Sequence, residues 1–231
     1  MGQQAAEASS CETFRPYAIT LDQIPAFHSH VQAHRALSRA TPLKDLEQLF
    51  PRLQKIPGVL TGTIDAPEIL RDPYRAKAGV RGCAMAHREL WSLLQHKPGP
   101  HLILEDDAVA REPAALCARL QSVREDMIAK NVDLVNLGPS GETGDPSASS
   151  WGTFAYMLSQ RGAALALKHT DSVRYPIDEQ LIQLCRKRVL RCDIQRHFQH
   201  GGGGNSYTSL MSTTRAPRTH RPETTRKPER G

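Results

Sequence analysis

The chain has 231 residues, 39% of them hydrophobic, and a formal net charge of +6. This length fits one domain of ordinary size with tails, and the apolar fraction is sufficient for a substantial buried core. Most of the excess positive charge lies in residues 212–231. The rest of the chain is nearly neutral, so a basic folded surface for duplex DNA is not indicated.

Both ends of the chain are predicted to be extensions of a single domain. We expect a flexible N-terminal arm at residues 1–14, a catalytic domain at 15–211 and a basic disordered tail at 212–231. Six basic and two acidic residues give the tail +4 of the total +6. It could contact an acidic partner or a membrane surface, but a solvated segment is the simpler interpretation, and no specific nucleic acid is expected.

Several features bear on cellular location. Residues 1–10 lack the apolar core of a secretory signal, and no apolar run is long enough to span a bilayer. Position 6 is Ala6, where myristoylation of Gly2 would want Ser or Thr. The five cysteines are scattered without zinc-site spacing, which favours a reducing compartment. We therefore expect a cytoplasmic protein, with peripheral membrane contact as an alternative.

Strands and helices are predicted to alternate in the first half of the chain. A short strand is predicted at 17–21, directly before Asp22. A helix begins at Thr41-Pro42, with Thr as cap, and runs to about Leu53. A second strand is placed at 59–64. The next helix, about 76–96, carries one apolar stripe that includes His87.

The second half continues the alternation. The apolar run Leu102-Ile103-Leu104 predicts a buried strand that ends in three carboxylates. The helix after the carboxylates is predicted to face inward with Leu116, Leu120, Val123 and Met127. Further strands are predicted at 132–137, 152–159 and 189–194, with helices at 161–168 and from Asp178 and a mobile loop at 140–150. The pattern predicts an α/β domain with a mainly parallel central sheet and flanking helices, whose ligands bind at the carboxyl ends of strands.

The acidic triplet Glu105-Asp106-Asp107 lies at such a strand end. Adjacent carboxylates repel one another and favour a compensating cation. If the backbone stays extended, Glu105 and Asp107 point to one side and Asp106 to the other. Two carboxylates on one side can bind Mg²⁺ or Mn²⁺, whose open positions would take phosphate oxygens. The alternative interpretation is a solvated acidic turn.

Five segments in order resemble glycosyltransferase family 25, which contains bacterial lipo-oligosaccharide transferases and procollagen galactosyltransferases. The segments are Tyr17 to Asp22, Gly82-Cys83-Ala84-Met85-Ala86-His87-Arg88-Glu89-Leu90-Trp91, Leu102 to Ala108, Gly152 to Ser159 with Gly162-Ala163, and Tyr175-Pro176-Ile177-Asp178. The resemblance covers about residues 16–210. It departs at Thr20, where Asn is usual, and at Ala86, where Ser is usual.

The resemblance implies a GT-A-like nucleotide-sugar-binding fold, a UDP-sugar donor, often UDP-galactose, and a divalent metal, Mn²⁺ or Mg²⁺. The implied activity is transfer of a hexose to a hydroxyl of a glycan, lipid or protein, as in lipopolysaccharide biosynthesis. Metal binding is assigned to Glu105 and Asp107, and catalysis to Asp107 and Asp178. Donor contacts are assigned to Thr20, Asp22, His87, Asp106, Gln199 and Ser206, and acceptor stacking to Trp151.

Structural alternatives accompany several of these assignments. Asp178 could be a general base or an ordinary helix N-cap. His87 could serve the donor side or be a hydrogen-bonded core histidine. Thr20 and Asp22 could simply form a strand-end turn. Trp91 is assigned to the core.

Two other glycine- or histidine-rich stretches are assigned no chemistry. The histidines at 28, 30 and 34 lack acidic or cysteine partners and are placed on a solvated face. The glycines at 201–204 lack the strand-loop-helix fingerprint of a phosphate loop and are read as a flexible loop.

Two other functions compete with the transferase. A metal-dependent hydrolase could use the same carboxylates to activate water, but it would need further ligands in a clear pattern. A catalytically inactive relative could act as a binding module through its basic tail; the intact triplet argues against that interpretation.

Overall fold

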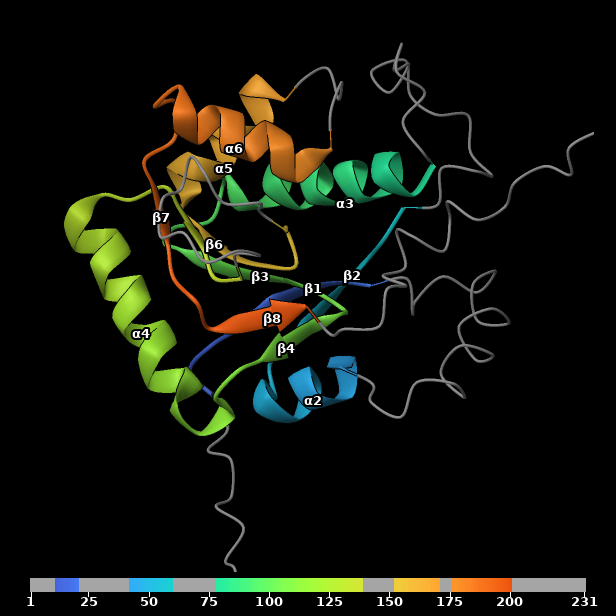
Figure 1. Ribbon diagram of the computed structural model, residues 1–231, viewed down its shortest axis with the longest axis vertical. Coiled ribbons are helices and arrows are strands. Elements are labelled where there is room, and N and C mark those ends of the chain that lie inside the picture. The colour runs from blue at the N-terminus through green and yellow to red at the C-terminus, as the bar shows by residue number, and fades with distance from the viewer. Residues whose placement is uncertain (1–10, 21–41, 60–77, 139–151, 171–175, 201–231) are drawn as a thin grey trace, which may run out of the picture.

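A computed structural model describes residues 11–20, 42–59, 78–138, 152–170 and 176–200. Within these ranges the chain forms an α/β fold around a central sheet of six strands in the order β2-β1-β3-β6-β5-β7 (Figure 1). The strands are β1 (Tyr17–Thr20), β2 (Gln54–Pro57), β3 (His101–Glu105), β5 (Leu134–Asn136), β6 (Ala155–Leu158) and β7 (Cys192–Ile194). The α/β prediction is confirmed.

The sheet is mostly parallel, with one exception. β1 runs parallel to β2 and β3, and β5 runs parallel to β7. β6 is antiparallel to both of its neighbours, β3 and β5. The consequence is that the segment before β6 arrives at the same edge of the sheet where β3 ends.

Helices cover both faces of this sheet (Figure 1). One layer contains α3 (Ala78–Leu94), α5 (Gln160–His169) and α6 (Ile177–Arg186), which pack on one another. The other contains α2 (Pro42–Leu49) and α4 (Pro113–Lys130). Residues that alternate along β3 serve the two layers, because successive side chains of a strand point to opposite faces. Ile103 packs with the α3 layer, and Leu102 and Leu104 pack with the α4 layer.

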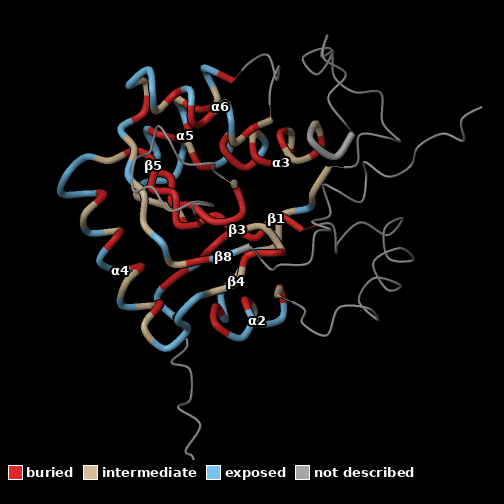
Figure 2. The backbone as a smooth tube through the Cα atoms, in the orientation of Figure 1, coloured by how far each residue is buried: buried red, intermediate tan, exposed pale blue. Residues whose placement is uncertain are grey.

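The buried residues form two cores, one between the sheet and each layer of helices (Figure 2). The inward residues of α4 are Leu116, Leu120, Val123 and Met127, as the helical spacing predicted. On α3, both Trp91 and Leu94 are fully buried, which confirms Trp91 as a core residue. No helix in the described part of the chain is long and apolar enough to cross a membrane.

Three strands differ from the sequence prediction. β2 occupies Gln54–Pro57, before the predicted strand at 59–64, of which only Val59 lies within the described residues. α2 ends at Leu49, so Leu53 lies outside the helix. β4 (Ala108–Ala110) and β8 (Phe198–His200) form a separate two-stranded antiparallel sheet that was not predicted. Both strands have only three residues, too few to show a period.

The cysteines also differ from the prediction. Cys11 is bonded to Cys117 and Cys185 to Cys192, with Cα–Cα distances of 5.3 and 5.7 Å that are usual for disulfides. Only Cys83 is a free cysteine. Disulfides persist in oxidising surroundings, so the pairing argues against the reducing compartment inferred from their scattered spacing. The sequence spacing of the cysteines did not predict these disulfides, because the fold brings the paired residues together.

The first described residues belong to the core. Cys11 is 1% exposed and Phe14 6% exposed, although both lie in the segment that was predicted to be an arm. The Cys11 backbone N–H donates to the Leu49 carbonyl at the end of α2. This part of the fold therefore begins before the predicted boundary at residue 15.

Candidate functional site

The candidate site lies at the carboxyl ends of two neighbouring parallel strands. β1 ends at Thr20 and β3 at Glu105, and the register pairs Ile19 with Glu105. Parallel neighbours end at the same edge of a sheet, which is where α/β folds bind ligands. The Thr20 side chain is buried at this edge.

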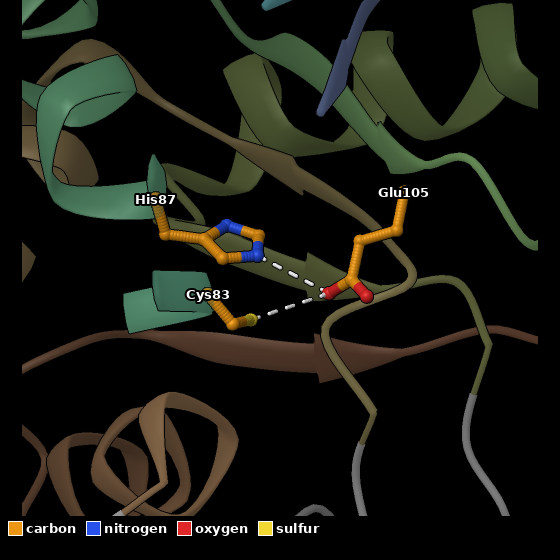
Figure 3. A group of neighbouring side chains, drawn as sticks. All are labelled: Cys83, His87 and Glu105. Atoms are coloured by element: carbon orange, nitrogen blue, oxygen red, sulfur yellow. Dashed lines mark hydrogen bonds and ion pairs between the residues drawn. The ribbon is translucent and has the colours of Figure 1, made fainter. Parts of the chain in front are cut away.

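Glu105 is the centre of a cluster with two side chains of α3 (Figure 3). The His87 Nε2 atom lies 3.2 Å from Glu105 Oε1, and the Cys83 Sγ atom lies 4.0 Å from the same oxygen. Cys83 and His87 are four residues apart, so both face the sheet from one side of the helix. Their ligand atoms and that of Glu105 all lie within 4.8 Å of one another.

A chain of hydrogen bonds holds His87 in place. Its Nδ1 atom lies 2.8 Å from the Tyr156 hydroxyl, which also accepts a hydrogen bond of 2.9 Å from Trp91 Nε1. If Tyr156 donates to Nδ1, His87 Nε2–H donates to Glu105, and every one of these polar atoms is satisfied. All three ring systems are buried, so this order matches the requirement that buried polar groups be paired. The core-histidine interpretation of His87 is therefore correct.

Thr153 adds a further donor to Glu105. Its hydroxyl donates to Glu105 Oε1 at 2.5 Å from the segment just before β6. The antiparallel direction of β6 brings this residue to the end of β3. Glu105 is thus fixed from the helix layer and from the sheet, while 18% of its side chain stays exposed.

The other two acids of the triplet lie in a turn. β3 ends at Glu105 and β4 begins at Ala108, so the chain turns at Asp106 and Asp107 and does not continue extended. The alternation argument that placed Glu105 and Asp107 on one side therefore does not apply. Asp107 is nevertheless nearly buried, at 9% exposed, whereas Asp106 is half-buried.

Asp178 lies in the first turn of α6 and does not cap it. The cap residue is Pro176, and the Asp178 carboxylate accepts from the backbone N–H of Glu179 at 2.9 Å. The alternative in which Asp178 is an ordinary N-cap is wrong, because α6 begins at Ile177 and its cap lies two residues before Asp178. Burial raises the pKa of Asp178, and the negative charges of Glu179 and Glu105 raise it further.

The Cys83 thiol is subject to the charge of several acids. Burial raises the pKa of the Cys83 thiol well above its usual value, and the carboxylates of Glu105, Asp178 and Asp107 add to the rise. The acids that act on this thiol come from β3, the following turn and α6.

The other predicted site residues lie on β8 or outside the described residues. Gln199 lies on β8, opposite Val109 of β4, and is exposed. Asp22, Trp151 and Ser206 lie outside the described residues, as do the histidines at 28, 30 and 34 and the glycines at 201–204.

Sequence reasoning missed Cys83 and two residues that hydrogen-bond to the cluster, Thr153 and Tyr156. Cys83 had a usable signal, because it precedes His87 by four residues on the same apolar stripe. Thr153 and Tyr156 had none besides the family-like segment, since they lie 48 and 69 residues from their partners in the cluster.

Comparisons with known proteins give limited information. No family model matches the chain, and no curated protein matches it, so membership of family 25 is not confirmed. Among solved structures, one that resembles the chain is a proposed nucleotide-diphospho-sugar transferase from Desulfovibrio desulfuricans G20. The identity is 10% and the TM-score 0.35, over 81% of this chain and 82% of that chain. That likeness is too distant to carry an argument about activity.

Proposed function

We propose that the chain is a nucleotide-sugar-dependent glycosyltransferase that moves a hexose from a UDP-sugar to a hydroxyl of a glycan, lipid or protein. UDP-galactose is the first donor to test. The observation that carries the proposal is the Glu105 carboxylate at the carboxyl end of β3, beside the end of β1, with the nearly buried Asp107 two residues further on. The charges of both acids and of Asp178 act on the neighbouring Cys83 thiol. Carboxylates in this arrangement suit a cation, and the cation in turn suits a negatively charged substrate.

A divalent metal fits the donor chemistry of this site. The carboxylates of Glu105 and Asp107 offer the oxygen ligands that Mg²⁺ and Mn²⁺ prefer. Burial is the main cause of the raised pKa of Asp178, and the neighbouring carboxylates, whose charge a cation would offset, raise it further. When bound, the metal would stabilise the negative charge of the departing diphosphate.

Asp178 is proposed as the residue that accepts the proton of the acceptor hydroxyl. A general base works best when its pKa lies nearer the working pH, and the pKa of Asp178 is shifted upward. This role requires inversion at the sugar carbon, because the base must lie on the face opposite the leaving diphosphate.

The other predicted contacts complete the proposal. Thr20, Asp22, Asp106, Gln199 and Ser206 are proposed to bind the donor, and Trp151 to stack on the acceptor sugar. His87 serves the donor side through Glu105, because its ring is completely buried and reaches that carboxylate.

The decisive experiment measures nucleotide binding and donor breakdown in the same preparations. UDP with Mn²⁺ should raise the melting temperature, and EDTA should remove the effect, because binding to the folded state alone stabilises it. UDP-galactose should be hydrolysed slowly without an acceptor, and a panel of other UDP-sugars would identify a different donor.

Asp107→Asn should abolish donor hydrolysis while the protein stays folded. The matched control is Asp126→Asn, which alters an exposed carboxylate on α4 and should leave hydrolysis unchanged. Full turnover by Asp107→Asn, or no response to any UDP-sugar, would refute the proposal. Cleavage of simple phosphate esters without sugar transfer would favour the hydrolase instead.

A further inference from the structure

The cluster of Cys83, His87 and Glu105 has a donor set that differs from that of a magnesium or manganese site. It offers one sulfur, one imidazole nitrogen and one carboxylate oxygen, all within 4.8 Å of one another (Figure 3). Hard cations prefer oxygen alone, whereas Zn²⁺ accepts thiolate, imidazole and carboxylate together. The chemistry of the cluster therefore selects a borderline-soft ion.

We propose that Cys83, His87 and Glu105 bind Zn²⁺ as three ligands and leave a fourth position open. In a tetrahedral zinc site, neighbouring ligand atoms lie about 3.3–3.8 Å apart, given the usual bond lengths. The distances observed are 3.2 Å between His87 Nε2 and Glu105 Oε1, and 4.0 Å between Cys83 Sγ and the same oxygen. All three ligand atoms lie within 4.8 Å of one another, so zinc binding would bring them closer together by up to about 1 Å.

The charge of the site matches a divalent cation. As the Zn–S bond forms, the Cys83 thiol releases its proton to solvent. The thiolate and the Glu105 carboxylate then carry two negative charges against the two positive charges of zinc.

The surroundings of His87 support a ligand role. Zinc-binding histidines usually hold their second ring nitrogen in a hydrogen bond. His87 Nδ1 lies 2.8 Å from the Tyr156 hydroxyl, whose oxygen can accept from both His87 and Trp91 Nε1. Zinc binding would therefore change the tautomer of His87, from Nε2–H donating to Glu105 in the metal-free site to Nδ1–H donating to Tyr156, so that the lone pair of Nε2 faces the cation. The partial exposure of Glu105 supplies an entry path.

Cobalt substitution tests the site directly, because thiolate-bound Co²⁺ has a charge-transfer absorption in the near ultraviolet. The other four cysteines are in disulfides, so in the absence of reductant this absorption can come only from Cys83. The wild type should develop the band with about one equivalent of Co²⁺, and Zn²⁺ should displace it, since zinc binds more tightly. Absence of the band would overturn the proposal.

Variants locate the ligands. Cys83→Ser should lose the band, and His87→Gln should lose it or weaken it strongly. His96→Gln is the matched control, because His96 is exposed just beyond the end of α3. Tyr156→Phe should weaken zinc affinity about 10- to 100-fold, the usual effect of losing a hydrogen bond to a ligating histidine. A band that survives Cys83→Ser would refute the site.

A measurement on the wild type covers the case in which these variants unfold. Zn²⁺ should protect Cys83 from alkylation by iodoacetamide, and Mg²⁺ should not; equal alkylation in both would count against zinc binding. Neither measurement uses a nucleotide. Both sites use Glu105: zinc would take Oε1, and the second oxygen of the carboxylate would serve the proposed Mg²⁺ or Mn²⁺. A failed zinc experiment therefore leaves the proposed transferase intact, and a failed hydrolysis assay leaves the zinc site intact.

Discussion

His87 Nε2 lies 3.2 Å from Glu105 Oε1. This contact joins a completely buried imidazole to a glutamate that has 18% of its side chain exposed. The contact connects the core of the α3 layer to the edge where β3 ends. A carboxylate held in this way keeps one orientation, because its partner cannot move without disturbing packed rings. Variants of this contact, of the other buried polar groups and of the two disulfides have distinct expected effects on stability.

Tyr156→Phe should lower the free energy of unfolding by about 2–4 kcal/mol. The hydroxyl serves both His87 and Trp91, so its loss leaves two buried polar groups without their partner. Tyr17→Phe is the matched control. Among the described residues, the Tyr17 hydroxyl accepts from Lys97 alone, and this exposed residue regains water, so the cost should be about 0.5–1 kcal/mol. Urea denaturation measures both; equal losses would contradict the shared-hydroxyl account.

Asp178→Asn should stabilise the protein near pH 7 by up to about 1 kcal/mol, discounted for partial exposure. The pKa of Asp178 is raised in the folded state, chiefly by burial, so folding disfavours the ionised carboxylate. This cost is present above the folded pKa and disappears as pH falls below the ordinary value of 3.8. The gain should therefore shrink between pH 7 and pH 4 in thermal unfolding.

Asp126→Asn is the control for that experiment, since it removes an exposed carboxylate on a different helix, α4. It should change stability by about 0.5 kcal/mol or less at both pH values. A gain from Asp178→Asn that does not depend on pH would contradict the electrostatic explanation.

Asp133→Asn should cost about 2–4 kcal/mol of unfolding free energy. Asp133 is 1% exposed and accepts from Arg161 Nε at 2.8 Å and Nη2 at 2.9 Å, as well as from the backbone N–H of Arg191. Asp126→Asn breaks an exposed pair with Lys130 on one helix and should cost about 0.5 kcal/mol or less. Guanidinium denaturation should separate the two variants clearly; similar midpoints would contradict the role of burial.

Replacing Cys11 and Cys117 by Ser should destabilise the protein about 2 kcal/mol more than replacing Cys185 and Cys192. The first disulfide closes a loop with a sequence separation of 106 and the second one of 7, and a longer closed loop restricts the unfolded chain more. Urea unfolding under non-reducing conditions measures both double variants. Thiol titration of the unreduced, denatured wild type should find one thiol, Cys83; five would show that the disulfides are absent.

The sequence by itself determined the elements whose signal is local. The apolar run of β3, its acidic end and the apolar stripe of α4 were all readable, because burial on one face imposes a period on the chain. The inward position of His87 followed from the same rule. These features predicted the α/β class and the edge of the sheet at which Glu105, Asp106 and Asp107 lie.

Only the tertiary structure decided which side chains meet at that edge. The antiparallel insertion of β6 carries Thr153 to Glu105 and Tyr156 to His87, across 48 and 69 residues of sequence. The Cys11–Cys117 disulfide and the pairing of β4 with β8 also join parts of the chain that are distant in sequence. A periodic pattern shows which face of an element is buried, but not what it is buried against; strand order and direction settle that.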